Sequence, residues 1–144
     1  MILFSKLLES ARHGKSGAGC VFLSKDTGRL LLSYRSSEVN EPHTWGTWGG
    51  KIDDNETPEQ TVRREIKEET GYTDKLRLVK LNKYTESNFE YNNYLAIVDK
   101  EFEPELNWES DAFKWVIFGQ WPTPLHFGLE SLISKSSNKI KQLI

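Results

Sequence analysis

Short runs of hydrophobic residues alternate with polar segments along this chain, and several of these runs are typical of strands. Residues 20–24 and 29–34 are apolar, and the segment Lys25 to Gly28 between them has the residues of a tight turn, so two strands joined by a turn are predicted. Similar patterns predict further strands over 76–84, 92–98 and 113–118.

The clearest helical pattern lies in the middle of the chain. Thr57 is a suitable N-cap, Pro58 suits the first helical position, and Gln60 completes a T-x-x-Q capping box. Gly71 lies where a left-handed residue commonly ends a helix. The sequence therefore predicts a helix over 58–70.

Two further helices are expected near the ends of the chain. Thr123-Pro124 repeats the cap-and-proline pattern and predicts the start of a final helix, which the polar stretch 135–139 is expected to weaken or end before Ile144. A short amphipathic helix is predicted at the start from the spacing of its apolar residues, Ile2, Leu3, Leu7, Leu8 and Ala11.

Two segments lack a clear periodic pattern. Residues 14–19 are small and predict a hinge before the first strand, and the polar stretch 35–55, rich in Gly and Trp, predicts a long functional loop. Strands and helices thus alternate irregularly, which predicts a layered α/β or α+β domain.

Composition narrows the class of protein. The 144 residues suffice for one domain, which we expect to span residues 1–144. No apolar run approaches the roughly 20 residues of a membrane helix, so a membrane-spanning protein is excluded. The net charge of −2 disfavours general nucleic-acid binding. The single cysteine, Cys20, permits no internal disulfide, and the charged start of the chain does not resemble a signal peptide, so we expect a cytoplasmic protein.

Three carboxylates share one face of the central predicted helix. Glu65, Glu68 and Glu69 are spaced i, i+3 and i+4, so they repel one another, and they lie near the helix C-terminus, where the macrodipole disfavours negative charge. A hard divalent cation would offset this repulsion, because it prefers clustered oxygen ligands. The alternative from the helix alone is a solvated charged surface.

The wider segment 50–72 resembles the Nudix box, G-x5-E-x7-R-E-U-x-E-E-x-G-U, where U is aliphatic. Ile66 fits the first aliphatic position, and Tyr72 departs from the last. Residues 45–71 are also similar to the same stretch of MutT-type nucleoside triphosphate pyrophosphohydrolases. The invariant positions of the box are all matched, by Gly50, Glu56, Arg64, Glu65, Glu68, Glu69 and Gly71.

The resemblance implies an α/β/α sandwich with a mixed central sheet and a site for Mg²⁺ or Mn²⁺. Arg64 would orient a catalytic carboxylate, and Glu65 or Glu68 would be the general base. Gly50, Glu56 and Gly71 would have structural roles, with Glu56 supporting the loop or an outer metal. The implied metal ligands are the Gly49 carbonyl, Glu65, Glu68, Glu69 and Glu109, with Asp111 as an alternative to Glu109.

Substrate contacts are a further set of expectations. Arg35 and Lys51 are candidates for binding phosphate, although a plain surface role for Arg35 is an equal alternative. Trp48 and Phe89, together with Trp45 and Tyr91, are candidates for stacking on a base, although aromatic residues more often belong to a core. His126 lies where some relatives contact the base, but a helix-start histidine without a ligand role is the preferred interpretation.

The resemblance implies hydrolysis of a phosphoanhydride in a nucleoside diphosphate linked to another group. A nucleoside triphosphate cleaved to monophosphate and pyrophosphate is the first expectation. Dinucleoside polyphosphates and RNA 5′ ends are alternatives within the enzyme class, and a non-catalytic nucleotide-binding regulatory module is the alternative of another class. The expected partner is a small nucleotide, and a monomer and a homodimer both remain open.

Overall fold

Two long strands form the centre of the sheet in the computed structural model, which describes residues 16–144. β1 (Ser16–Ser24) runs parallel to β6 (Phe89–Val98), with Ser16 opposite Glu90 and Ser24 opposite Val98. Strands covered on both faces are hydrophobic almost throughout, and β1 is buried from its second residue to its last. The helix predicted over residues 2–11 lies outside the described residues.

The remaining strands extend this pair on both sides. The order β3-β2-β1-β6-β5 describes the main path, while β4 pairs with β1 and β7 pairs with β2. The described strands form a seven-stranded mixed sheet, as expected. The bounds of the outer strands are β2 (Leu30–Arg35), β3 (Trp45–Gly46), β4 (Trp48–Lys51), β5 (Arg77–Glu86) and β7 (Ser110–Val116).

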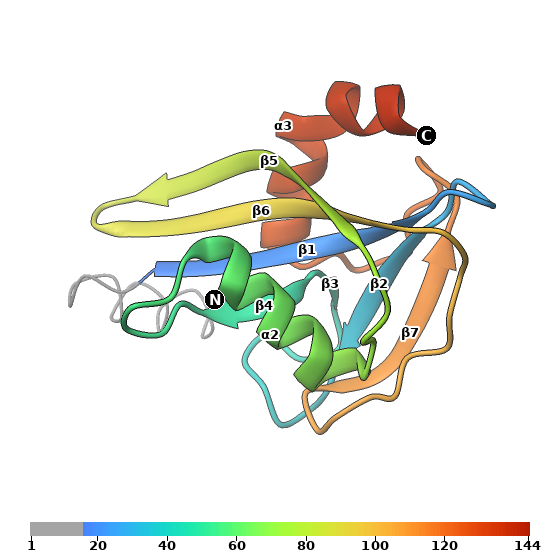
Figure 1. Cartoon of the computed structure of the whole chain (residues 1–144). Coiled ribbons are helices and arrows are strands. Elements are labelled where there is room, and N and C mark those ends of the chain that lie inside the picture. Colours follow the sequence, from blue (N-terminus) through green and yellow to red (C-terminus); the bar gives the residue numbers. More distant parts are fainter. Residues whose placement is uncertain (1–15) are drawn as a thin grey trace.

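Each face of the sheet is covered by a helix (Figure 1). Even-numbered residues of β1, such as Cys20 and Phe22, pack with Val62 of α2 (Pro58–Thr70). Odd-numbered residues, such as Val21, pack with Leu129 of α3 (Phe127–Leu143). This alternation follows from the period of two along a strand and confirms the α/β/α sandwich. Within residues 16–144, neither helix has the length and apolar character needed to cross a membrane.

The α2 bounds confirm the prediction. Thr57 accepts a hydrogen bond from the Gln60 backbone N–H, and the Gln60 side chain accepts one from the Thr57 N–H, which completes the capping box. Gly71 ends the helix in the left-handed conformation, with φ of 73°. Both ends are thus fixed by contacts within a few residues.

The small residues before the first predicted strand do not form a hinge, so this prediction is wrong for Ser16 to Gly19. They belong to β1, where glycine is needed because the Tyr91 ring crosses the strand. A Cβ on Gly17 would lie 2.7 Å from Cδ1 of Tyr91. The stretch 35–55 is not one loop either, because β3 and β4 interrupt it. β6 and β7 each begin earlier than predicted, at Phe89 and Ser110.

The final helix also differs from its prediction at both ends. It begins at Phe127 with His126 as N-cap, because residues 124–126 are held against Trp45, whose N–H donates to Pro124 O (2.9 Å) while His126 N–H donates to Trp45 O (2.8 Å). The polar stretch 135–139 remains helical, because Ser136 on its inner side donates to Asn82 Oδ1 (2.9 Å) and Ile140 in the next turn is buried.

Candidate active site

The carboxylates of α2 divide between a buried and an exposed side. Glu65 and Glu69 are spaced i, i+4 on the side that faces the sheet, and they are 8% and 4% exposed. Glu68 lies on the outer side, with 53% of its side chain exposed, and its Oε2 is 3.4 Å from Nη1 of Arg64. Two acidic side chains are therefore buried together beside β4.

Two adjacent glycines of β4 permit this close approach. The Gly49 N–H donates to Oε1 of Glu69 (3.1 Å). A Cβ on Gly50 would lie only 2.6 Å from Oε1 of Glu65, so any larger residue would displace that carboxylate. The glycines of the matched segment thus bring main-chain groups against the α2 carboxylates.

Glu109, from the segment before β7, joins the two buried carboxylates. Burial raises the pKa of Glu69 well above its usual value, and the neighbouring Glu65 and Glu109 raise it further. Burial also raises the pKa of Glu109, as does Glu65, while contact with the Glu69 carboxyl and the charge of Arg35 act in the opposite direction. The alternative acid, Asp111, is exposed on β7 and does not line the nearby cavity.

The donor set fits a hard divalent cation. The Oε2 atom of Glu69 is buried and has no hydrogen-bond partner among the described residues, and clustered carboxylate oxygens are the ligands that Mg²⁺ and Mn²⁺ prefer. In the described part of the chain, no three acidic, His or Cys side chains already stand around a common point as metal ligands would. Glu65 and Glu68 both contact Arg64 instead.

Arg64 connects the carboxylates to the preceding loop. Its Nε and Nη2 donate to the two carboxylate oxygens of Glu56 (2.9 and 3.0 Å), and its Nη1 donates to Glu65 (2.9 Å). This pairing, together with a hydrogen bond from Thr61, lowers the pKa of Glu56 to about 2. Glu56 also accepts from the Asp53 N–H (3.1 Å), so one guanidinium fixes both the loop and Glu65.

A cavity of about 370 Å³ adjoins the carboxylate cluster. Glu109, Gly49 and Gly50 line one part of it. Aromatic residues line another part of it, and these come from β5, β6, the segment before β7 and the start of α3: Tyr84, Phe89, Tyr91, Trp108, His126 and Phe127. The Glu109 carboxylate and these rings therefore line the same cavity.

Three of the four predicted substrate residues line this cavity. Lys51 is exposed there, and Phe89 is 3% exposed. Arg35 also lines it, but its Nε donates to Asn40 O (3.0 Å), so the guanidinium supports the loop after β2. Burial lowers the pKa of Arg35.

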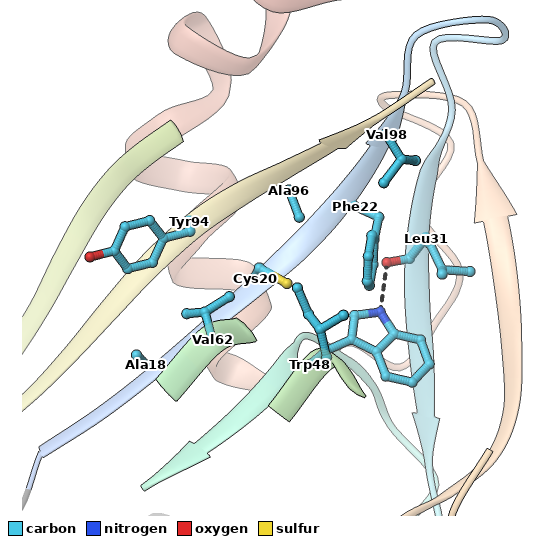
Figure 2. Packing of buried hydrophobic residues seen from close by; sticks show 10 residues of the cluster. Ala18, Cys20, Phe22, Leu31, Trp48, Val62, Tyr94, Ala96 and Val98 are labelled. Carbon is cyan, nitrogen blue, oxygen red and sulfur yellow. Dashed lines mark hydrogen bonds between the residues drawn. The ribbon is translucent and has the colours of Figure 1, made fainter. Parts of the chain in front are cut away.

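The prediction that Trp48 stacks on a ligand is wrong, because its position does not allow contact with one. It is 1% exposed, lies in the core between α2 and the sheet, and does not line the cavity. Its Nε1 donates to Leu31 O (3.1 Å), as Figure 2 shows. Trp45 packs against the other core cluster, on the α3 face. The two tryptophans therefore support the sheet from opposite faces.

Several cavity residues were missed by the sequence analysis. Asn93, Trp108 and Phe127 line the cavity, but no motif or spacing marks them. His126 was considered and set aside, yet its imidazole is both the α3 N-cap and part of the cavity wall. Residues of this kind become visible only when distant segments are brought together.

Comparison with known proteins agrees with this architecture. Residues 14–135 match the sequence profile of the NUDIX domain. A Mycobacterium tuberculosis protein, named as a candidate 8-oxo-dGTP diphosphatase, is 31% identical over 130 residues, which cover 82% of this chain and 60% of that protein. A Streptomyces rubellomurinus protein, named CMP-5′-(N-acetyl-N-hydroxy-3-aminopropyl)phosphonate hydrolase, is 39% identical over 56 residues, which cover 39% of this chain and 27% of that protein.

The chain thus spans less than two thirds of either relative. Among solved structures, the MutT NUDIX hydrolase from Burkholderia pseudomallei is similar, with a TM-score of 0.62, 25% identity and coverage of 83% of this chain and 97% of that chain. The Nudix hydrolase RenU from M. smegmatis shares the fold, with a TM-score of 0.72, 24% identity and coverage of 92% and 88%. Because the domain profile matches most of its length, the chain belongs to the NUDIX domain family.

Proposed function

We propose that this protein is a hydrolase that depends on Mg²⁺ or Mn²⁺ and cleaves a phosphoanhydride in a nucleoside diphosphate linked to another group. A nucleoside triphosphate is the proposed substrate, with a monophosphate and pyrophosphate as products. The observation that carries the proposal is the cluster of Glu65, Glu69 and Glu109 beside the cavity, which contains a buried carboxylate oxygen with no partner among the described residues.

The cation would be held by the carboxylates of Glu65, Glu69 and Glu109 and by the main-chain carbonyl of Gly49. When bound, it supplies charge that neutralises the anhydride oxygens and lowers the pKa of the attacking water. The raised pKa values of Glu69 and Glu109 support this assignment, because they arise from burial and then from neighbouring carboxylates, and a bound cation would offset both effects.

Arg64 would act as a positioning residue. Its guanidinium holds Glu65 at 2.9 Å and is itself held by both oxygens of Glu56. A bidentate pair of this kind fixes the plane of the guanidinium, so it also fixes the direction in which the Glu65 carboxylate is presented.

Glu68 would accept the proton from the attacking water. Its side chain is half exposed and is free of the buried packing that restrains Glu65, so it can turn from Arg64 toward the open side of the cluster. Lys51, exposed at the cavity beside Gly50, would attract the phosphates.

The named relatives favour a nucleotide substrate. The M. tuberculosis protein is named for a nucleoside triphosphate and the Streptomyces protein for a CMP-linked phosphonate. Both compounds join a nucleoside to a phosphorus-containing group, which is the chemistry proposed here.

Product release from a panel of nucleoside triphosphates, with and without Mg²⁺, tests the proposal. We expect metal-dependent turnover that falls about a thousandfold in Glu69→Gln, because the amide keeps the volume of the side chain but loses a charged oxygen ligand. Glu59→Gln is the matched control, because Glu59 is exposed in the first turn of the same helix. Calorimetric titration with Mn²⁺ alone should show weaker binding in Glu69→Gln only. Equal turnover in both variants would contradict the metal assignment.

A further inference from the structure

Asn93 of β6 faces the cavity, and its amide has no hydrogen-bond partner among residues 16–144. The residue is 3% exposed and lines the cavity. Its side chain makes no hydrogen bond with any residue in the part of the chain that the structure describes. Its donor and acceptor are thus open to the cavity, where a group that enters can pair with both of them.

The preceding residue shows what an ordinary structural asparagine does on the same strand. Asn92 is 5% exposed, and its Nδ2 donates to the carbonyl of Gly17 on the neighbouring strand (3.2 Å). Because successive side chains of a strand point to opposite faces, Asn92 lies on the α2 face and Asn93 on the α3 face. The two residues therefore share type, strand and burial, but only Asn92 has a hydrogen-bond partner among residues 16–144.

The surroundings of Asn93 suit a flat, apolar ring. Phe89 and Tyr91 lie on the same face of β6, with ring centroids 6.3 Å apart and planes inclined by 36°. Across the cavity, Phe127 has its ring 4.7 Å from that of His126 and 6.2 Å from that of Tyr84. Aromatic walls of this kind favour a planar heteroaromatic group by stacking and edge contacts.

His126 adds a second polar group at this wall. Its Nδ1 accepts a hydrogen bond from the Gly128 N–H (3.0 Å), so the proton of the neutral imidazole lies on Nε2. That Nε2 atom is buried, has no hydrogen-bond partner among residues 16–144, and is 3.7 Å from Oε2 of Glu41. The aromatic part of the cavity thus contains polar groups at defined positions, which is the arrangement of a selective binding site.

We propose that Asn93 is the specificity-determining residue of the site, and that its amide forms a paired donor and acceptor hydrogen bond to the edge of the nucleobase. This inference rests on the proposed function, because the cation held by the carboxylate cluster, together with Lys51, would place the phosphates at the other part of the cavity. Each nucleobase presents an acceptor next to a donor on one edge, so selection among bases would come from where the amide and the surrounding rings hold that edge.

The chemistry of the amide predicts how substitutions change selectivity. Asn93→Leu removes both hydrogen bonds and leaves an apolar wall that cannot distinguish base edges. Asn93→Asp leaves acceptors only, so it should favour an edge with two adjacent donors, as guanine has at N1 and N2. Sites that hydrogen-bond a substrate reject analogues strongly because their buried polar groups are then left unpaired.

The test measures kcat/KM for ATP, GTP, CTP and UTP with Mg²⁺ in the wild type and the variants. We expect the ratio between the best and the poorest substrate to exceed about tenfold in the wild type and to fall below about threefold in Asn93→Leu. In Asn93→Asp, the value for GTP relative to the others should rise about tenfold. Asn92→Leu is the matched control, and it should lower thermal stability while keeping the wild-type order of substrates.

A second measurement separates this inference from the proposed function. Calorimetric binding of the four nucleoside monophosphates, without added metal, should show the same base preference and its loss in Asn93→Leu. Turnover with a base preference that is unchanged in both Asn93 variants, or with no preference in the wild type, would overturn the role of Asn93 and leave the hydrolase intact. Base-selective binding without turnover would support Asn93 and overturn the hydrolase, whereas neither binding nor turnover would overturn both.

Discussion

Arg64 bonds to several groups around the segment from Gly50 to Gly71, whereas Asn93 and Nε2 of His126, at the aromatic part of the cavity, have no partner among the described residues. Arg64 donates to Glu56, Glu65 and the Lys51 carbonyl within one short stretch of chain. Asn93 and His126 come from distant elements and contribute groups with no hydrogen-bond partner among the described residues. The contacts of Arg64 thus fix the geometry of the loop and of Glu65, whereas no such contacts hold Asn93.

Among the variants that test this comparison, substitution of Arg64 is expected to have the largest effect. In Arg64→Ala we expect kcat to fall about a hundredfold, because Glu56 loses its bidentate partner and Glu65 is no longer held in one direction. Steady-state kinetics on the preferred nucleotide measure the effect. Arg63→Ala is the control, since Arg63 is exposed on the same helix. Similar rates in the two variants would show that the pairing of Arg64 has no part in positioning.

An effect of intermediate size is expected in the pH dependence of the free energy of unfolding, and it arises from His126 in the cavity wall. Burial, and then the charge of Arg35, lower the pKa of His126 to about 4. Because the unfolded imidazole binds a proton near pH 6.5, protonation favours unfolding as the pH falls from about 6.5 to 4. By pH 4 this linkage should cost about 2 to 3 kcal/mol of stability. The contribution of the neutral His126 imidazole to the free energy of unfolding is fully present above pH 6.5.

The matched variant for this experiment is His126→Asn, because asparagine also caps a helix and does not titrate. Urea unfolding at several pH values should show a steeper loss of stability in the wild type than in the variant. The raised pKa values of Glu69 and Glu109 act in the opposite direction, but they are present in both proteins and cancel in the difference. Parallel curves would mean that the imidazole is not kept neutral by its surroundings.

The smallest effects are expected from substitution of Trp48 and Trp108, which should change different quantities. Trp48→Phe should lower the free energy of unfolding by about 1 to 2 kcal/mol, because the Leu31 carbonyl loses its buried donor, while KM stays unchanged. Trp108 is 64% exposed and lines the cavity, so Trp108→Phe should change KM with little effect on stability. Denaturation curves and steady-state kinetics measure both quantities. A raised KM in Trp48→Phe would contradict the purely structural role of Trp48 and indicate that it contacts the ligand.

The sequence alone determined the parts of the protein that depend on near neighbours. The bounds of α2 follow from the capping box at Thr57 and the left-handed Gly71, and both act within a few residues. The shared direction of Glu65 and Glu69 follows from the helical repeat. The alternating apolar strands were also predicted, because a strand buried on one or both faces carries that pattern in its own residues.

Only the tertiary structure decided which residues meet across the chain. Trp48 became part of the core because the register of β4 on β1 places it there, and His126 became the cap of α3 because Trp45 holds the preceding residues extended. Asn92 and Asn93 are the same residue type in the sequence, and only the orientation of β6 separates a structural amide from one that faces the cavity. Local hydrogen bonds and helical spacing are encoded by neighbouring residues, whereas burial and pairing between distant segments depend on how the whole sheet assembles.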